Sequence, residues 1–121
     1  MIRAYHLSTG ADGQSHVIRG SIVQHQSVDV QSIHFEETPA HSSLDWHDAP
    51  TAQYVITLAG ILEFVTQGGE IFTIEPGDVL IALDTTGGGH KWRLTNDQPW
   101  KRAYVMFKKD VKINFLADSA P

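Results

Sequence analysis

The sequence contains no cysteine and has few positive charges. The lack of cysteine excludes disulfide bonds, thiolate catalysis and cysteine-based zinc sites, so packing alone must hold the fold together. The 9 Lys and Arg residues are scattered along the chain, and the 14 Asp and Glu residues outnumber them to give a net charge of −5. Nucleic-acid binders usually carry a clustered basic surface, so DNA and RNA are not expected as partners.

Long apolar runs and helical patterns are also missing. No apolar stretch approaches the roughly 20 residues that a membrane-spanning helix needs. Residues 1–6 lack the apolar core of a secretion signal. We therefore expect a cytoplasmic protein without a membrane partner. No long window repeats its apolar residues with the 3.6-residue period of an amphipathic helix, so we expect an all-β fold.

Short apolar segments, separated by Gly, Pro and Asp turns, account for most of the chain. Their spacing of about ten residues predicts a sandwich or barrel of the jelly-roll type, and the length predicts one domain over residues 1–121. We expect Gly20 to bend or bulge its strand, residues 40–50 to form a polar loop with a short extended end, and a polar tail from Ala117 to fray. The predicted strands cover residues 2–7, 15–24, 28–35, 53–58, 61–65, 70–74, 79–83, 90–94 and 100–108.

Seven histidines are many for 121 residues, and without cysteine they are the natural candidates for metal ligands. The stretch from Trp46 to Gly60 places His47 and Gln53 just before an alternating, β-branched strand. His90 follows a second unit of strand and glycine-rich turn. We expect folding to bring His47, Gln53 and His90 together. The remaining histidines, among them His6, His16, His25 and His34, are more typical of surface or core positions.

These segments resemble the two motifs of the cupin superfamily. The first family motif has two histidines one residue apart, then an acidic or amide ligand and a glycine, and the second has a turn with proline and glycine followed by a third histidine. The resemblance covers roughly residues 28–107 and implies a double-stranded β-helix, that is, a jelly-roll β-barrel, in a small single-domain cupin. The residues that match are His47, Gln53, Gly60, Pro76, Gly77 and His90.

The chain departs from the family pattern at two positions. Ala49 stands where the second histidine belongs, and Gln53 stands where many cupins have glutamate. The resemblance therefore implies a reduced ligand set of His47, Gln53 and His90, which has no anionic member. A divalent Fe, Mn, Ni, Cu or Zn ion is the expected metal if one is bound, because imidazole and amide ligands suit these ions.

Three carboxylate or imidazole groups are candidates to complete or support such a site. Asp84 lies six residues before His90 and could supply a carboxylate or orient His90 through its second ring nitrogen. Asp45 or His41 could reach the rim from the loop. The alternative interpretation is that His47 and His90 are only hydrogen-bonded to Gln53 and to the backbone.

A second interpretation needs no metal. If Asp84 orients its imidazole, His90 could act as a general base. The resemblance implies the same chemistry, because metal-free sugar epimerases of the cupin superfamily use a histidine supported by an acid. Against this, Asp84 is also a common residue type at the start of a turn. Trp46 and Trp92 flank the two motif histidines and are candidates for the wall of a substrate pocket, although core packing explains Trp92 equally well.

We expect from the sequence a small-molecule site at the mouth of a barrel. This site would belong to a divalent-metal enzyme acting on a small polar substrate, to a non-catalytic binding or sensing module, or to a metal-free isomerase or epimerase. Tyr54, Ile56 and Leu58 have strand parity opposite to Gln53 and form an apolar stripe that needs cover. A homodimer would provide part of this cover.

Overall fold

The computed structural model describes residues 1–118 and contains β-strands but no helix within that range. No segment of this range forms a helix long and apolar enough to cross a membrane. The all-β prediction is confirmed. The strands are β1 (Arg3–Thr9), β2 (Ser15–Ile22), β3 (Val30–Thr38), β4 (Ser43–His47), β5 (Gln53–Ala59), β6 (Leu62–Thr66), β7 (Ile71–Ile74), β8 (Val79–Ala82), β9 (His90–Leu94), β10 (Trp100–Phe107) and β11 (Phe115–Ala117).

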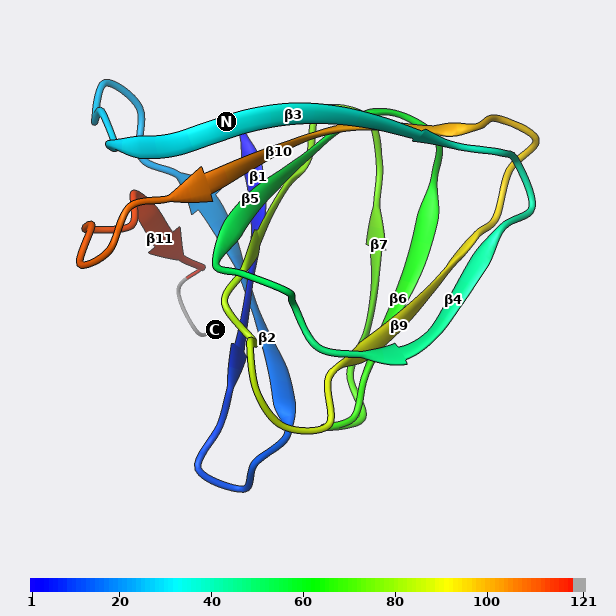
Figure 1. Cartoon of the computed structure of the whole chain (residues 1–121), viewed down its shortest axis with the longest axis horizontal. Helices are drawn as coiled ribbons and strands as arrows, with labels where there is room; N and C mark the ends of the chain where they lie inside the picture. The colour runs from blue at the N-terminus through cyan, green and yellow to red at the C-terminus, as the bar shows by residue number, and fades with distance from the viewer. Residues whose placement is uncertain (119–121) are drawn as a thin grey trace.

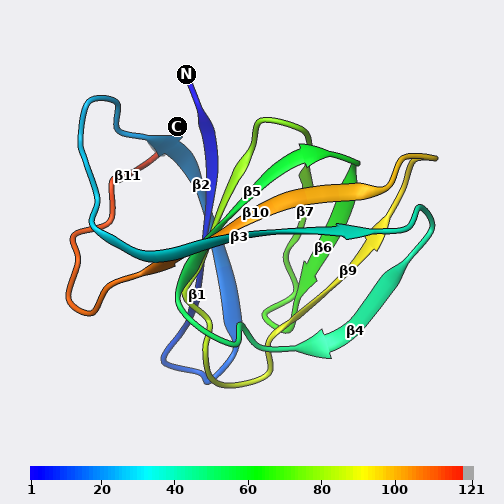
Figure 2. The same ribbon diagram turned by 45° about the horizontal axis from the view of Figure 1, so that its top comes forward.

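The strands form a sandwich of two sheets (Figure 1). The larger sheet has the order β11-β2-β1-β8-β5-β10-β3, and the smaller sheet has the order β4-β9-β6-β7. Most pairs are antiparallel, and β1 runs parallel to β8. The turned view in Figure 2 shows the smaller sheet facing the β5–β10–β3 half of the larger one. No ladder joins the two sheets within residues 1–118, so the strands do not close into a hydrogen-bonded barrel.

The main core lies between the two sheets, because inward and outward residues alternate along each strand. Aromatic rings form much of it: Phe72 stacks on Tyr5 and on Phe64, with centroids 5.0 and 5.2 Å apart, and Trp92 meets Trp100 edge to face at 4.8 Å. Other members of this cluster are Leu7, Leu62, Ile74, Leu80 and Leu94. Large rings bury much apolar area per residue, which suits a chain that has no disulfide.

A second apolar cluster covers the outer face of the larger sheet. Tyr54 packs here on Phe107, and Ile56 lies at the edge of the same cluster, so both face away from Gln53 as their parity predicts. The segment after β10 returns over this face, and its Ile113 and Phe115 supply part of the cover that a partner chain was expected to give. Leu58 stays 55% exposed.

Three local predictions need correction. Residues 43–47 form strand β4 within the predicted polar loop, and a strand not predicted, β11, ends at Ala117. Of the predicted bend or bulge at Gly20, the bulge is wrong, because β1 and β2 pair there without a shift of register. A Cβ at Gly20 would lie 2.1 Å from the carbonyl oxygen of Leu116, so the glycine instead admits β11. Of the tail predicted to fray, residues 119–121 lie outside the described range.

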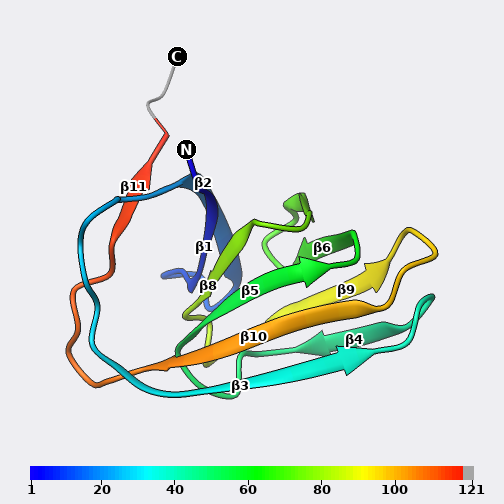
Figure 3. The same ribbon diagram turned by 90° about the horizontal axis from the view of Figure 1, so that it is seen from above.

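Strands β3 and β4 follow one another through a short turn and form edges of different sheets (Figures 1 and 3). Strand β3 is exposed along nearly its whole length, and its outward residues Ile33 and Phe35 are 57% and 66% exposed. An edge strand has unpaired backbone groups that can accept another strand. The homodimer expected from the sequence stays a prediction.

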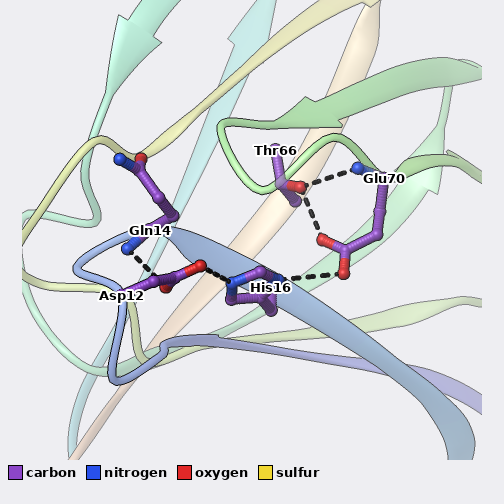
Figure 4. Close-up of polar contacts among 5 residues, drawn as sticks. All are labelled: Asp12, Gln14, His16, Thr66 and Glu70. Carbon is purple, nitrogen blue, oxygen red and sulfur yellow. Dashed lines mark hydrogen bonds and ion pairs between the residues drawn. The ribbon is translucent and has the colours of Figure 1, made fainter.

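A polar cluster joins the β1–β2 hairpin to the β6–β7 hairpin (Figure 4). The ring of His16 lies between two carboxylates, with Nε2 2.8 Å from Asp12 Oδ2 and Nδ1 3.1 Å from Glu70 Oε2. Hydrogen bonds to Asp12 and then to Glu70 raise the pKa of His16. The backbone N–H of Gln14 and the ring of His16 lower the pKa of Asp12. Burial acts to raise the pKa of Glu70, but the hydrogen bonds from Thr66 and His16 outweigh it and lower this pKa.

These shifts predict a pH-dependent contribution of His16 to stability. A raised histidine pKa stabilises the fold fully below the unfolded value of about 6.5, and this stability is lost as the pH rises through the folded pKa. The lowered pKa values of Asp12 and Glu70 act in the opposite sense. Their contribution to stability is present above the unfolded pKa values and is lost as the pH falls through the folded ones. We expect His16→Gln to reduce the free energy of unfolding, measured in urea, more at about pH 5.5 than at about pH 8.5.

A matched control removes both carboxylates. In an Asp12→Asn, Glu70→Gln background, the loss caused by His16→Gln should no longer depend on pH, since the imidazolium has lost its charged partners. An equal loss at both pH values in the otherwise unchanged protein would contradict the proposed role of the cluster.

Candidate functional site

A cavity of about 380 Å³ lies between the two sheets. This volume is within the range of sites for small organic molecules. The smaller sheet contributes one wall and the β5–β10–β3 part of the larger sheet contributes the other. We call the wall from the smaller sheet the first wall and the wall from the larger sheet the second wall. The polar residues that line the cavity are His47 and His90 on the first wall, His34, Glu36, Gln53, Arg102 and Tyr104 on the second wall, and Thr51 in the loop between β4 and β5.

A β-bulge in β4 turns His47 toward this cavity. Leu44 pairs with Trp92, but His47 pairs with His90, so the register shifts by one residue between them. In a regular strand, residues three apart face opposite sides of the sheet. The shift lets Leu44 and His47 both line the cavity, and bulges commonly redirect a side chain in this way.

His47 presents a free ring nitrogen to the cavity. Its Nδ1 lies 2.8 Å from the carbonyl oxygen of Asp45. A carbonyl only accepts, so Nδ1 carries the proton and, in the neutral ring, Nε2 keeps its lone pair. Burial is the main cause that lowers the pKa of His47, and the nearby His90 acts in the same direction. The lowered pKa favours the neutral ring of His47, which can act as an acceptor or a ligand.

His90 is the first residue of β9 and packs against His47 with ring centroids 4.4 Å apart. The side chain is buried, and its Nδ1 lies 2.6 Å from Oδ2 of Asp84. A carboxylate partner places the ring proton on Nδ1 and leaves Nε2 as the free nitrogen. The two imidazoles thus have the same tautomer, each fixed by an acceptor behind the ring.

Asp84 is fully buried at the base of the site. Its Oδ2 accepts hydrogen bonds from Ser15 Oγ at 2.7 Å and from His90, while Oδ1 is buried without a hydrogen-bond partner among residues 1–118. Its backbone oxygen accepts from the N–H of Ala49 at 2.9 Å, which ties the β4–β5 loop to the same residue. Asp84 therefore does more than begin a turn, because it connects β2, β9 and this loop.

The donor set fits a divalent metal only in part. Gln53 is 5% exposed and lines the cavity with His47 and His90, so these three predicted ligands share one cavity. Within residues 1–118, no group of three or more His, Cys, Asp or Glu side chains could hold a metal ion. Asp84 is bonded behind His90, and Ala49 occupies the cavity wall without a ligating atom. A metal would thus meet two neutral imidazoles and one amide oxygen.

The two tryptophans predicted for the pocket differ in position. Trp92 lines the cavity and also packs in the core. Trp46 is 40% exposed, does not line this cavity, and has Lys91 Nζ 4.7 Å above its ring. The two loop residues considered as additional ligands are also elsewhere: His41 is exposed beside Asp97, and the Asp45 carboxylate accepts from the backbone of Trp46.

Sequence reasoning missed Ser15 and Arg102. Ser15 gives no signal in the sequence, because a serine at the start of a strand is unremarkable and its partner Asp84 lies 69 residues away. Arg102 could have been found by parity. It alternates with Trp100 and Tyr104 along β10, and all three line the cavity. A lone arginine in a strand is usually assigned to solvent, which hides such a position.

Gly89 allows the backbone just before His90 to lie close to the backbone of His47. Its φ is +77°, and a Cβ there would lie 2.0 Å from the carbonyl oxygen of His47. We expect Gly89→Ala to lower the free energy of unfolding by about 3 kcal/mol or more, since both the backbone and the contact are strained. It should also shift the imidazole NMR signals of His47 and His90.

Gly69 is the matched control. It has φ +94°, but a Cβ there meets nothing within 4 Å. Gly69→Ala should therefore reduce stability by only about 1 kcal/mol, the strain of the left-handed backbone alone. Equal losses for the two variants would show that the contact with His47 does not matter.

Comparison with known proteins does not identify the chain. No protein-family model matches it, and no curated protein matches it. The two-sheet fold is compatible with a jelly roll.

Proposed function

We propose that the cavity binds a small polar molecule and that His90, held by Asp84, transfers a proton on it without a metal. The observation that carries this proposal is the 2.6 Å hydrogen bond between His90 Nδ1 and the fully buried carboxylate of Asp84. A general base requires a fixed tautomer with a free nitrogen, and this bond supplies it. The reaction class is isomerisation or epimerisation next to a carbonyl group.

The proposed proton transfer uses three side chains of the cavity. His90 Nε2 takes a proton from an acidic C–H of the ligand, and the C–H electron pair moves toward the neighbouring carbonyl to form an enolate. The Asp84 carboxylate stabilises the imidazolium by charge. The amide of Gln53 can donate to the enolate oxygen. For isomerisation, the His90 imidazolium returns the proton to the adjacent carbon while the hydroxyl proton of the enediolate moves to the former carbonyl oxygen. For epimerisation, the imidazolium gives its proton to solvent and a water molecule protonates the opposite face.

The fold supports placing this site in a cupin-type jelly roll, which we include in the proposal. The motif residues His47, Gln53 and His90 come from β4, β5 and β9 and line one cavity between the two sheets. That convergence is what the resemblance implies. Of the three functions expected from the sequence, the metal-free isomerase or epimerase is therefore the one that we favour.

A divalent metal on His47, Gln53 and His90 is the second candidate. The observation in its favour is that each imidazole donates Nδ1–H to an acceptor behind it, as metal-bound histidines commonly do. Fe, Mn, Ni, Cu or Zn would be the expected ion. The lack of an anionic ligand weakens this candidate.

The proposed reaction predicts exchange of ligand protons with solvent. Small hydroxyaldehydes, hydroxyketones and 2-oxo acids are first screened for thermal stabilisation, because a bound ligand raises stability by mass action. The compounds that bind are then incubated in D₂O and followed by proton NMR. We expect His90→Gln to slow deuterium incorporation by about 10²–10⁴-fold and Asp84→Asn to slow it by about tenfold or more.

His25→Asn is the control, because His25 is exposed, lies away from the cavity, and has a positive φ of 62° that asparagine tolerates. Its exchange rate should match the unchanged protein. Exchange that persists in His90→Gln would contradict the proposal. Ligands that bind without any exchange or turnover would instead support a non-catalytic binding or sensing module.

Metal content separates the two leading candidates. We expect protein purified without a histidine tag to contain substoichiometric metal by elemental analysis, and its exchange activity to survive dialysis against EDTA. Stoichiometric metal that is lost in both His47→Ala and His90→Ala would favour the metal centre and overturn the metal-free mechanism.

A further inference from the structure

Arg102 brings a buried positive charge to the second wall of the cavity. It lies on β10, and its side chain is only 6% exposed. The guanidinium stacks on Trp100, with Cζ 3.9 Å from the ring centroid, and lies 5.4 Å from that of Tyr104. A buried cation is unfavourable unless it is paired, so the partners of Arg102 decide what the cavity can bind.

Most of those partners are neutral. Nη1 donates to Thr38 Oγ1 at 2.6 Å and to the backbone oxygen of Trp100 at 3.2 Å, and Nε donates to the hydroxyl of Tyr104 at 3.1 Å. These bonds fix the orientation of the guanidinium but leave its charge uncompensated. A planar guanidinium held in this way is well suited to bind a carboxylate or phosphate group.

Within residues 1–118, the only ion pair of Arg102 is with Glu36. Nη2 and Glu36 Oε1 are 3.5 Å apart, and the Glu36 side chain is 50% exposed at the cavity rim. The other Glu36 oxygen lies 2.8 Å from His34 Nε2, so the carboxylate is shared. Solvent weakens such a half-exposed pair, and Glu36 can swing outward without burying its charge.

The remaining ionisable groups of the cavity are the imidazoles of His34, His47 and His90 and the phenol of Tyr104. Asp84 does not line the cavity and is already bonded to Ser15 and His90. With Glu36 turned out, the cavity therefore contains one permanent cation and no anion. Electrostatic complementarity then favours a negatively charged ligand.

We infer that the ligand of this cavity is a small organic anion whose carboxylate or phosphate group binds Arg102 and displaces Glu36. The inference rests on the proposed function, because it assigns the ligand class of the same site. Arg102 is on the wall opposite His90, so an anion bound there directs its uncharged part toward the imidazoles. Glu36 acts as an internal competitor that occupies Arg102 when the ligand is absent.

Matched pairs of probes test the charge requirement. Lactate is compared with lactamide, and glycerol 3-phosphate with glycerol, by calorimetric titration and by the fluorescence of Trp92 and Trp100. We expect the anions to bind and their neutral counterparts to bind at least about tenfold more weakly, the usual scale for charge-assisted hydrogen bonds. The two pairs also show whether carboxylate or phosphate is preferred.

Two substitutions should act in opposite directions. Glu36→Gln should tighten binding of the preferred anion by about tenfold, because it removes the competitor and leaves Arg102 in place. Arg102→Gln should weaken binding by about tenfold to a hundredfold, with Arg102→Lys in between. Glu37→Gln is the control, since it makes the same charge change on the neighbouring residue, which does not line the cavity.

The outcomes distinguish this inference from the proposed function. Equal binding of neutral and anionic probes, no tightening in Glu36→Gln, or no binding of either anion by Glu36→Gln at millimolar concentration would overturn the anion assignment. Proton exchange that depends on His90 but not on Arg102 would leave the proposed function intact. Anion binding that depends on Arg102 but is not accompanied by proton exchange would support the anion assignment and contradict the proposed proton transfer.

Discussion

The site depends on the hydrogen bonds that the buried carboxylate of Asp84 accepts from His90 and Ser15. Asp84 follows β8 of the larger sheet, and it accepts from His90 at the start of β9 in the smaller sheet. It also accepts from Ser15 at the start of β2, while its backbone holds the β4–β5 loop through Ala49. One residue thus fixes how the two sheets meet at the base of the cavity and which way the His90 ring is turned.

This arrangement is poorly explained by stability alone. A fully buried carboxylate loses its hydration, and here Oδ1 recovers no hydrogen bond among the described residues. An apolar residue of similar size would fill the same space without that penalty. What Asp84 provides instead is orientation: it fixes one tautomer of His90, and the carbonyl of Asp45 does the same for His47. Strained or unsatisfied groups of this kind concentrate at functional sites.

The sequence predicted most strands because strand alternation is a local property that survives in almost any context. It failed at β4, where the bulge breaks the alternation between Leu44 and His47 and where five mostly polar residues look like a loop. It also misjudged Gly20, since the close approach of Leu116 is a tertiary contact that no local pattern records. The pairing of Asp84 with His90 could be suggested from spacing and resemblance, but its geometry could not.

Arg102 shows why the chemistry of the second wall was hidden. Its neighbours Trp100 and Tyr104 lie two residues away on the same strand, but its hydrogen-bond acceptor Thr38 and its ion-pair partner Glu36 approach it only when β3 pairs with β10. The motif residues lie on β4, β5 and β9, so a motif search describes the imidazoles and the amide but not the charge that faces them. The cavity is therefore polarised across its width. A ligand with one anionic end and one reactive end would fit this arrangement in only one orientation, which a site that must select one proton requires.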